Sequence, residues 1–214
     1  MLIYKSSWFY EFCVRCLYGP AYEDRYRPVA DEIPSHAEVL DICCGDFQIY
    51  KKYLKQRQIR YTGLDKSKAF ARCAGKSGIP FIQGDVTREK IPRSDYILLM
   101  GSLYQFYDES GPLLRTLLKA ANQKLIVTED LKSLGRRENL FVSGCAQLMT
   151  GAKKRFSPES FDILMREFTP FIEKKTAIAD GHEIMVIFNV QKYNATTPAT
   201  MPCLEDEMER HELA

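Results

Sequence analysis

Three aspartates and one glycine, Asp41, Gly45, Asp65 and Asp85, are spaced along the first half of the chain as a ligand site requires. A carboxylate offers hydrogen-bond acceptors and no donor, so Asp65 can accept from two neighbouring hydroxyls of a sugar. Glycine has no Cβ, so the backbone at Gly45 can approach a ligand closely. Asp65 follows Gly45 by twenty residues, close to the separation expected for a sugar-binding carboxylate on the next strand. Each aspartate alone could be a turn or cap residue. The prediction of a ligand site therefore depends on the order and spacing of all four residues.

Apolar segments of strand length alternate with longer segments of helical period, which indicates a parallel sheet with helices on both faces. The predicted strands are residues 38–43, 60–65, 80–84, 95–101, 123–129, 171–179 and 183–191. The predicted helices are residues 50–58, 66–76, 111–122 and 157–168. Ser157 caps the last of them, and Pro158 and Glu159 suit its first turn. The turn Asp180-Gly-His182 predicts an antiparallel hairpin of the last two strands.

The sequence therefore predicts an α/β, Rossmann-like three-layer sandwich with a mostly parallel seven-stranded sheet, a C-terminal antiparallel hairpin and helical lid elements. Residues 1–34 form an N-terminal helical cover, and residues 35–191 form the main domain, with a helical insertion at about 131–156. Residues 192–214 carry too little apolar surface to order and form a tail. Ligands of such sheets bind beyond the carboxyl ends of the strands, where the aspartates fall.

The strand ends read Asp41-Ile-Cys-Cys-Gly-Asp-Phe47, Gly63-Leu-Asp65, Gln83-Gly-Asp85 and Met100-Gly-Ser102. Over about residues 21–191 this series resembles the class I S-adenosylmethionine-dependent methyltransferases, which implies that cofactor, that activity and a methyltransferase-like catalytic domain at 35–191. The resemblance places Asp65 at the ribose, Asp85 with Val86 at the adenine, and Gly101 with Ser102 beside the methyl group. The cofactor-binding residues that it implies are Tyr22, Tyr26, Asp41, Cys43, Gly45, Asp65, Lys66, Asp85, Val86, Gly101 and Ser102.

The loop after the first strand departs from the family pattern. The three alternating glycines of the family become Cys43, Gly45 and Phe47, so only the central glycine is present. Cysteine is small, but we expect Phe47 to narrow the turn or to push the following helix away.

The segment after the fourth strand points to the kind of substrate. It reads Ser102-Leu-Tyr-Gln-Phe106 and lacks the Asn- or Asp-Pro-Pro-aromatic turn of methyltransferases that modify amines of nucleic acids or glutamine. It resembles the small-molecule branch, with Gln105 where a histidine often stands. The predicted catalytic residues are Tyr104, Gln105 and His182, with Glu129 and Asp130 as further candidates to orient or deprotonate a substrate. Packing, helix capping and turn formation are the respective alternatives for these side chains.

Apolar side chains in the insertion, Phe141, Leu148, Met149 and Phe156, favour an apolar or amphiphilic small-molecule substrate, although helix packing explains any one of them. The formal net charge is only +2, which gives no strong nucleic-acid signal. The basic run from Lys51 to Arg60 is typical of a solvated helix face.

The seven cysteines are an odd number, which favours a reducing compartment, and we predict a cytoplasmic protein. Cys13 and Cys16 have metal-ligand spacing without a second pair, so thiols on a helix face are favoured over zinc and no metal is predicted. Glu11 and Arg15 interrupt the apolar N-terminus, so neither a signal peptide nor a transmembrane segment is expected, and peripheral membrane contact stays open. No oligomeric state is assigned.

Three functions compete. The first is a small-molecule methyltransferase, and the second is a catalytically inactive, methyltransferase-like binding or scaffold protein, suggested by Phe47 and the missing histidine. The third, a nicotinamide-dependent oxidoreductase, is disfavoured because the loop lacks the Gly-x-Gly-x-x-Gly pattern that brings a pyrophosphate to helix amides.

Overall fold

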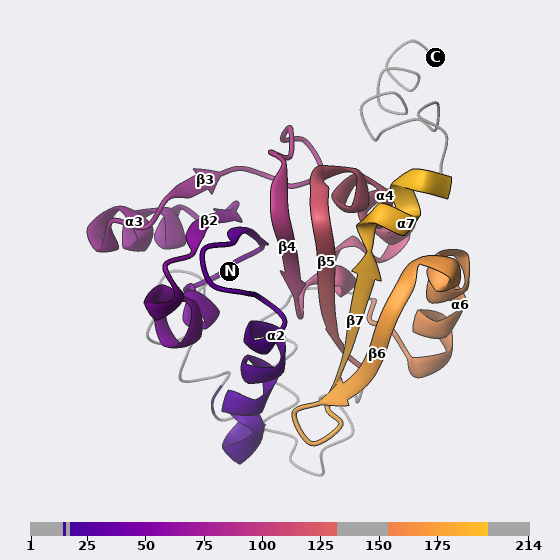
Figure 1. Ribbon diagram of the computed structural model, residues 1–214. Coiled ribbons are helices and arrows are strands. Elements are labelled where there is room, and N and C mark those ends of the chain that lie inside the picture. The colour runs from indigo at the N-terminus through magenta and orange to yellow at the C-terminus, as the bar shows by residue number, and fades with distance from the viewer. Residues whose placement is uncertain (1–14, 16–17, 132–153, 197–214) are drawn as a thin grey trace.

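The computed structural model describes residues 15, 18–131 and 154–196, and its seven strands form one sheet in the order β3-β2-β1-β4-β5-β7-β6 (Figure 1). The strands are β1 (Glu38–Ile42), β2 (Arg60–Asp65), β3 (Phe81–Gln83), β4 (Ser94–Met100), β5 (Ala121–Asp130), β6 (Ile172–Ile178) and β7 (Glu183–Asn189). The first five pair in parallel, whereas β7 runs antiparallel to both β5 and β6. The strand order reverses between β1 and β4, so a ligand is expected beyond the carboxyl ends of these two strands.

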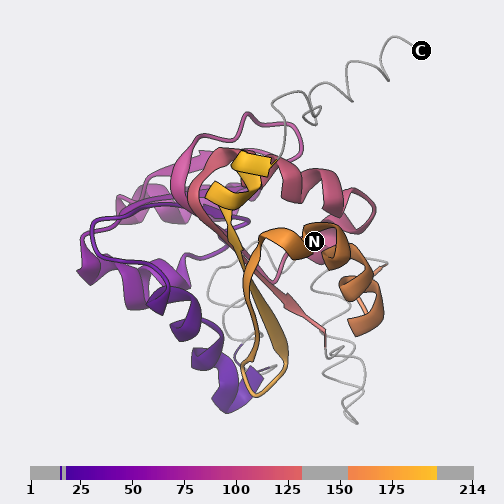
Figure 2. The ribbon, with the colours of Figure 1, turned by 45° about the vertical axis from the view of Figure 1, so that its right-hand side comes forward.

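Helices cover both faces of the sheet and make three layers (Figure 2). One face carries η2 (Gly19–Arg25), α2 (Arg27–Asp31), η3 (Tyr50–Leu54), η4 (Lys55–Arg57) and α3 (Lys68–Ser77). The other carries η5 (Leu103–Glu109), α4 (Ser110–Ala120), α6 (Pro158–Phe168), η7 (Thr169–Phe171) and α7 (Val190–Thr196). Each layer closes its own apolar core against the sheet, so the predicted three-layer sandwich with a C-terminal antiparallel hairpin is confirmed.

Local signals set several element ends as predicted. The Ser160 backbone N–H donates to Ser157 Oγ at 3.1 Å, and the Ser157 N–H donates back to Ser160 Oγ at 2.9 Å, so α6 begins with a reciprocal cap. In the hairpin turn, Ala179, Asp180 and Gly181 all take positive φ, the left-handed backbone that lets β7 return beside β6.

Other boundaries differ from the predictions for tertiary reasons. The helix predicted at 111–122 ends at Ala120, because Ala121 pairs with Ser94 and opens β5. The helix predicted at 50–58 is π-helical over Tyr50–Leu54 and then 3-10. The helix predicted from residue 66 begins at Lys68, where Ser67 caps it.

The predicted tail begins later than residue 192. Helix α7 continues through Thr196, and Tyr193 is buried against Phe171, with ring centroids 5.0 Å apart. Burial of that aromatic ring against η7 explains why the composition misplaced this boundary. The rest of the proposed tail, residues 197–214, lies outside the described residues, as do most of the insertion and the start of the cover.

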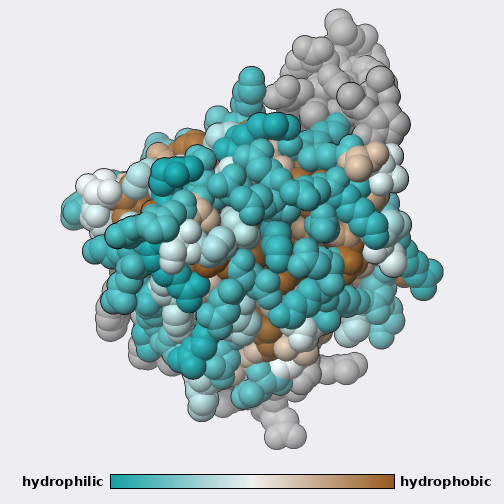
Figure 3. Space-filling model, in the orientation of Figure 1, coloured by the Kyte–Doolittle hydropathy of each residue, from teal (hydrophilic) through white to brown (hydrophobic). Residues whose placement is uncertain are grey.

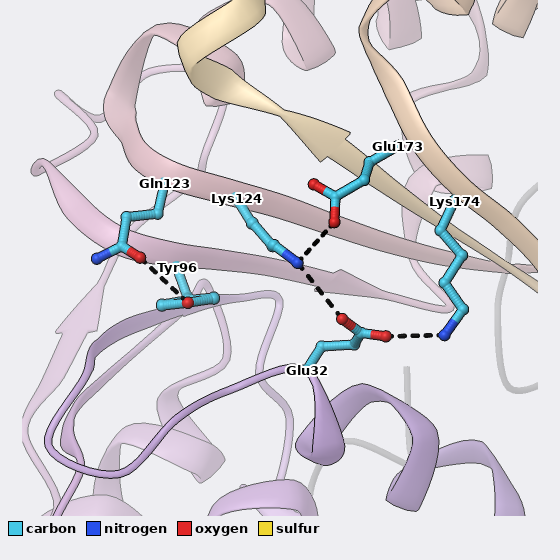
Figure 4. A network of polar contacts seen from close by, with 6 residues as sticks. All are labelled: Glu32, Tyr96, Gln123, Lys124, Glu173 and Lys174. Atoms are coloured by element: carbon cyan, nitrogen blue, oxygen red, sulfur yellow. Dashed lines mark hydrogen bonds and ion pairs between the residues drawn. The ribbon is translucent and has the colours of Figure 1, made fainter.

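The end of α2 is tied to the far strands by an exposed ionic network (Figure 4). Glu32, the residue that follows this helix, accepts hydrogen bonds from Lys174 at 2.8 Å and from Lys124 at 3.5 Å. Lys124 also donates to Glu173 at 2.9 Å. Such pairs contribute little individually, but here they connect α2 with β5 and β6 and help to orient the cover.

The face seen in Figure 3 is mainly hydrophilic, with apolar residues showing in small separate areas. Within the described ranges, no helix combines the length and the apolar character that a membrane crossing requires. The basic residues Lys52, Arg57 and Arg60 pair with Glu23, Asp31 and Glu38, which agrees with a solvated face.

Candidate functional site

A cavity of about 290 Å³ opens where β1, β2, β3 and β4 end. Each of these strand ends contributes to its wall, because carboxyl ends of parallel strands meet at one edge of the sheet. Its lining consists of Cys43, Gly45, Leu64, Asp65, Lys66, Ser67, Phe70, Gly84, Asp85, Val86, Ser102, Gln105 and Phe106. We call this the larger cavity.

Asp65, the last residue of β2, lines the larger cavity. Its Oδ2 accepts the Gly45 backbone N–H at 3.2 Å, and its Oδ1 accepts the Ser67 N–H at 2.8 Å. Burial raises the pKa of the Asp65 carboxyl, while the two backbone N–H groups and Lys66 oppose that rise. Each carboxylate oxygen has two lone pairs, so both oxygens can accept a further hydrogen bond from a ligand hydroxyl.

Asp85 follows β3 and is fixed by a local turn. Its Oδ1 accepts the Thr87 N–H at 3.1 Å and the Thr87 hydroxyl at 2.8 Å. Partial burial opposes ionisation, but the two bonds from Thr87 and the charges of Lys66 and Arg88 lower the pKa of Asp85 below its ordinary value. Asp85 therefore brings an ionised acceptor to this wall, beside the buried apolar Val86.

The loop after β1 has left-handed backbone at the three positions where the family has glycines, although only one of the three residues is a glycine. Cys43, Gly45 and Phe47 have φ values of 55°, 56° and 61°, so all three lie in the left-handed region. This conformation turns the Phe47 ring into the core, where it is fully buried and packs edge-to-face on Phe81 at 5.8 Å. Phe47 lines neither cavity, so its ring takes no space from them.

A smaller cavity of about 40 Å³ adjoins this loop on the side of the N-terminal cover. It shares Cys43 and Gly45 with the larger cavity, and its lining comprises Arg25, Tyr26, Asp41, Cys43, Cys44, Gly45, Asp46, Gln48, Ile49 and Met100. One buried guanidinium and two buried carboxyls therefore surround a small polar space.

Asp41 is an acid of the smaller cavity with a perturbed pKa. Burial, together with the nearby Asp65 and Asp46, raises the pKa of Asp41 to about 7, although the Tyr61 hydroxyl, which donates to Oδ2 at 2.7 Å, opposes the rise. A carboxyl with such a pKa near neutrality favours a cationic partner, because a positive charge would offset the cost of burying the ionised form.

The sequence-predicted binding residues are divided between the two cavities. Cys43, Gly45, Asp65, Lys66, Asp85, Val86 and Ser102 line the larger cavity, and Tyr26 and Asp41 line the smaller one. Tyr22 lies behind Tyr26, with ring centroids 5.4 Å apart, and lines neither. Gly101 is next to Ser102 but lines neither cavity.

Arg25 is the main residue that sequence reasoning missed. It lines the smaller cavity and is buried, and it lies within the cover segment that carries Tyr22 and Tyr26. Its position one residue before Tyr26 was the only signal that could have indicated it.

Of the three predicted catalytic residues, Gln105 alone lines either of the two cavities. Gln105 lines the larger cavity, whereas Tyr104 is buried beneath the Arg155 guanidinium, 4.9 Å from its ring centroid. His182 lies in the hairpin turn, 6.3 Å from the Tyr18 ring.

Glu129 on β5 does not line the larger cavity, but it bonds the backbone of a segment that does. Its Oε2 accepts the Tyr104 backbone N–H at 3.1 Å, which ties β5 to the segment carrying Ser102 and Gln105. Burial, Glu183 and Asp130 raise the pKa of Glu129 to about 8, against the hydrogen bond from Tyr104 and the charge of Arg155. The raised pKa favours the protonated form of the Glu129 carboxyl at neutral pH.

The strand order, the reversed hairpin and the acidic strand ends define the fold of the class I S-adenosylmethionine-dependent methyltransferases. The family model described as "Methionine biosynthesis protein MetW" matches residues 23–155. That range is more than half of the chain, so the protein belongs to the MetW family.

Solved structures share the fold at low sequence identity. A SAM-dependent methyltransferase from Aquifex aeolicus has a TM-score of 0.60 at 13% identity, over 83% of this chain and 96% of its own. Human N-acetylserotonin methyltransferase in complex with SAM has a TM-score of 0.59 at 16% identity, over 87% of this chain and 57% of its own.

An O-methyltransferase family 2 protein from Planctomyces limnophilus, in complex with apigenin, has a TM-score of 0.57 at 18% identity over 84% of this chain. The present chain covers 60% of the length of that protein. No curated protein sequence matches the chain.

Proposed function

We propose that the protein transfers a methyl group from S-adenosylmethionine to a small molecule. The observation that carries this proposal is the position of Asp65, which lines the larger cavity and whose two oxygens each accept one backbone N–H. Such a carboxylate suits the paired hydroxyls of a ribose, because it accepts two hydrogen bonds and offers no donor.

The two cavities fit the two ends of this cofactor. The larger cavity is lined by the acceptor Asp65 and by the apolar side chains of Leu64 and Val86. A nucleoside needs both, an acceptor for its ribose hydroxyls and apolar surface for its base. The smaller cavity joins Arg25 with Asp41 and therefore offers both charges to an amino-acid end. Cys43 and Gly45 line both cavities, and we propose that one elongated ligand occupies the two.

When bound, S-adenosylmethionine supplies a methyl group already activated on a sulfonium. The chain then needs to hold the acceptor in line and to exclude water, and alignment provides most of the catalysis. Ser102, Gln105 and Phe106 close the larger cavity on the β4 side, where the Gln105 amide can orient an acceptor and Phe106 offers an apolar surface.

The substrate is proposed to be an apolar or amphiphilic small molecule. Phe156, one of the four residues on which this rests, is buried and stacks on Tyr107 at 4.6 Å, so it packs rather than lines a cavity. Phe141, Leu148 and Met149 lie outside the described residues. Phe106 in the larger cavity wall is what supports an apolar acceptor.

Isothermal titration with S-adenosylmethionine tests the proposal. The intact protein should bind, and Asp65→Ala should weaken binding at least about tenfold, because two hydrogen bonds to a charged group are lost. Asp162→Ala is the matched control, since Asp162 lies on α6 and pairs with the exposed Lys175. An intact protein that gives no binding heat would overturn the proposal.

Methyl transfer from labelled cofactor separates the enzyme from the alternative, a binding or scaffold protein. Phe47, one of the two reasons for that alternative, packs in the core and lines neither cavity. Cofactor binding without transfer to any compound of a chemically diverse set would favour the alternative.

A further inference from the structure

Arg25 is held in one orientation by groups that come from both ends of the chain. Its Nη2 forms an ion pair with Glu183 Oε1 at 2.8 Å, and both side chains are buried. The guanidinium also lies over the Tyr18 ring at 4.3 Å and near the Tyr26 ring at 5.2 Å. The Tyr18 hydroxyl donates to the same Glu183 oxygen at 2.6 Å. The first strand residue after the hairpin turn thus anchors a side chain of the cover.

Gly101 at the end of β4 leaves the room that Arg25 occupies. A Cβ at this position would lie 2.9 Å from Arg25 Nη2, and Gly101 has a φ of +55°. Any larger residue would push against the guanidinium. This explains the glycine at 101 without placing it on a cavity wall.

The charges around Arg25 are those of a zwitterion site. Arg25 shares the smaller cavity with Asp41 and Asp46, all three of them buried. A guanidinium has five N–H donors in a planar fork that suits a carboxylate, so its ion pair through Nη2 is compatible with binding a ligand carboxylate as well. A carboxyl opposite it suits an ammonium.

Arg25 lines the smaller cavity, which the proposed function gives to the amino-acid end of the cofactor. We propose that Glu183 and Gly101 are positioning residues that hold the Arg25 guanidinium toward the carboxylate of that end. This rests on the proposed function and adds the residues that read one end of the ligand. Arg25 touches the ligand, whereas Glu183 and Gly101 act through Arg25.

The test compares two ligands that differ at this end. S-adenosylhomocysteine carries the amino-acid end, and 5′-methylthioadenosine has the same nucleoside without it. We expect Arg25→Gln and Glu183→Gln to weaken the binding of S-adenosylhomocysteine at least about tenfold, because a charge-assisted contact is lost. The affinity for 5′-methylthioadenosine should change less than about twofold. Glu167→Gln, which changes an exposed glutamate on α6, should alter the affinity for neither ligand.

Gly101→Ala supplies a variant that keeps every charge. This variant should weaken the binding of S-adenosylhomocysteine but not that of 5′-methylthioadenosine, because the added Cβ displaces the Arg25 guanidinium. Gly78→Ala is its control, because Gly78 also has a positive φ, +64°, but a Cβ there meets nothing within 4 Å. Thermal unfolding of each variant shows that the protein under titration is folded.

The two ligands separate the possible failures. If the intact protein binds both ligands equally, or if the variants weaken both equally, Arg25 does not read the amino-acid end and this inference is wrong. If the intact protein binds neither ligand, the proposed function itself fails. Selective loss in Arg25→Gln with no loss in Glu183→Gln and Gly101→Ala would overturn the positioning roles alone.

Discussion

The Gly45 backbone N–H donates to Asp65 Oδ2 at 3.2 Å and so joins the loop after β1 to the end of β2. The glycine therefore has two roles: it takes a φ of +56° and presents its amide to a carboxylate that lines the larger cavity. A change in the backbone of this loop should therefore also shift Asp65, the proposed ribose acceptor.

Gly45→Ala should impair cofactor binding more than it impairs folding. A Cβ in the left-handed region costs about 1 kcal/mol, and residue 45, unlike residue 78, lines both cavities. Gly78→Ala carries the same backbone strain at the end of α3, away from both cavities. Titration with S-adenosylmethionine, beside urea unfolding, should show equal destabilisation of the two variants and weaker binding only in Gly45→Ala. Equal affinities would contradict this role.

Phe47→Ala should act on stability. The Phe47 ring is fully buried against Phe81, and large-to-small changes of a buried phenylalanine cost about 3–5 kcal/mol. Urea unfolding should show that loss, while the folded variant at low temperature should bind S-adenosylmethionine as the intact protein does. A variant of unchanged stability that lost cofactor affinity would place the ring in the site instead.

Glu129→Gln should change how stability depends on pH. The pKa of Glu129 is about 8 in the folded protein against an ordinary 4.5, so between these values the unfolded chain releases a proton that the folded protein keeps. Stability from this group is therefore full below pH 4.5 and is lost as the pH rises to about 8. A glutamine side chain at this position can still accept the Tyr104 N–H through its amide oxygen, and it does not titrate.

Urea unfolding at about pH 5, 6.5 and 8 spans the window between the two pKa values of Glu129 and measures this effect. The free energy of unfolding of Glu129→Gln, relative to the intact protein, should increase steadily across the series. Asp41, whose pKa is raised in the same direction, is present in both proteins and cancels from the difference. Parallel pH profiles would show that Glu129 is ionised in the folded protein.

Tyr193→Ala should destabilise the protein, although composition assigned this residue to a tail. Its ring is buried against Phe171, and its loss should cost about 3 kcal/mol. Thermal unfolding should show a melting temperature several degrees lower. Lys192→Ala, at the exposed neighbouring position, should leave that temperature unchanged.

The sequence by itself determined the features that depend on local chemistry. Alternating strand and helix periods predict the seven strands, the Ser157 cap predicts the start of α6, and Asp180-Gly-His182 predicts the hairpin. Asp65 and Asp85 were also recognisable, because the residue at the carboxyl end of a parallel strand faces the ligand edge whatever packs behind it.

Only the tertiary structure decided where Phe47 and Arg25 point. A left-handed backbone turns Phe47 into the core, and no rule of residue type predicts a phenylalanine there. Arg25 is set by Glu183, which is distant in the sequence, and by the missing Cβ of Gly101. Such a site is made by contacts between distant segments, and their meeting is a property of packing that local spacing does not encode.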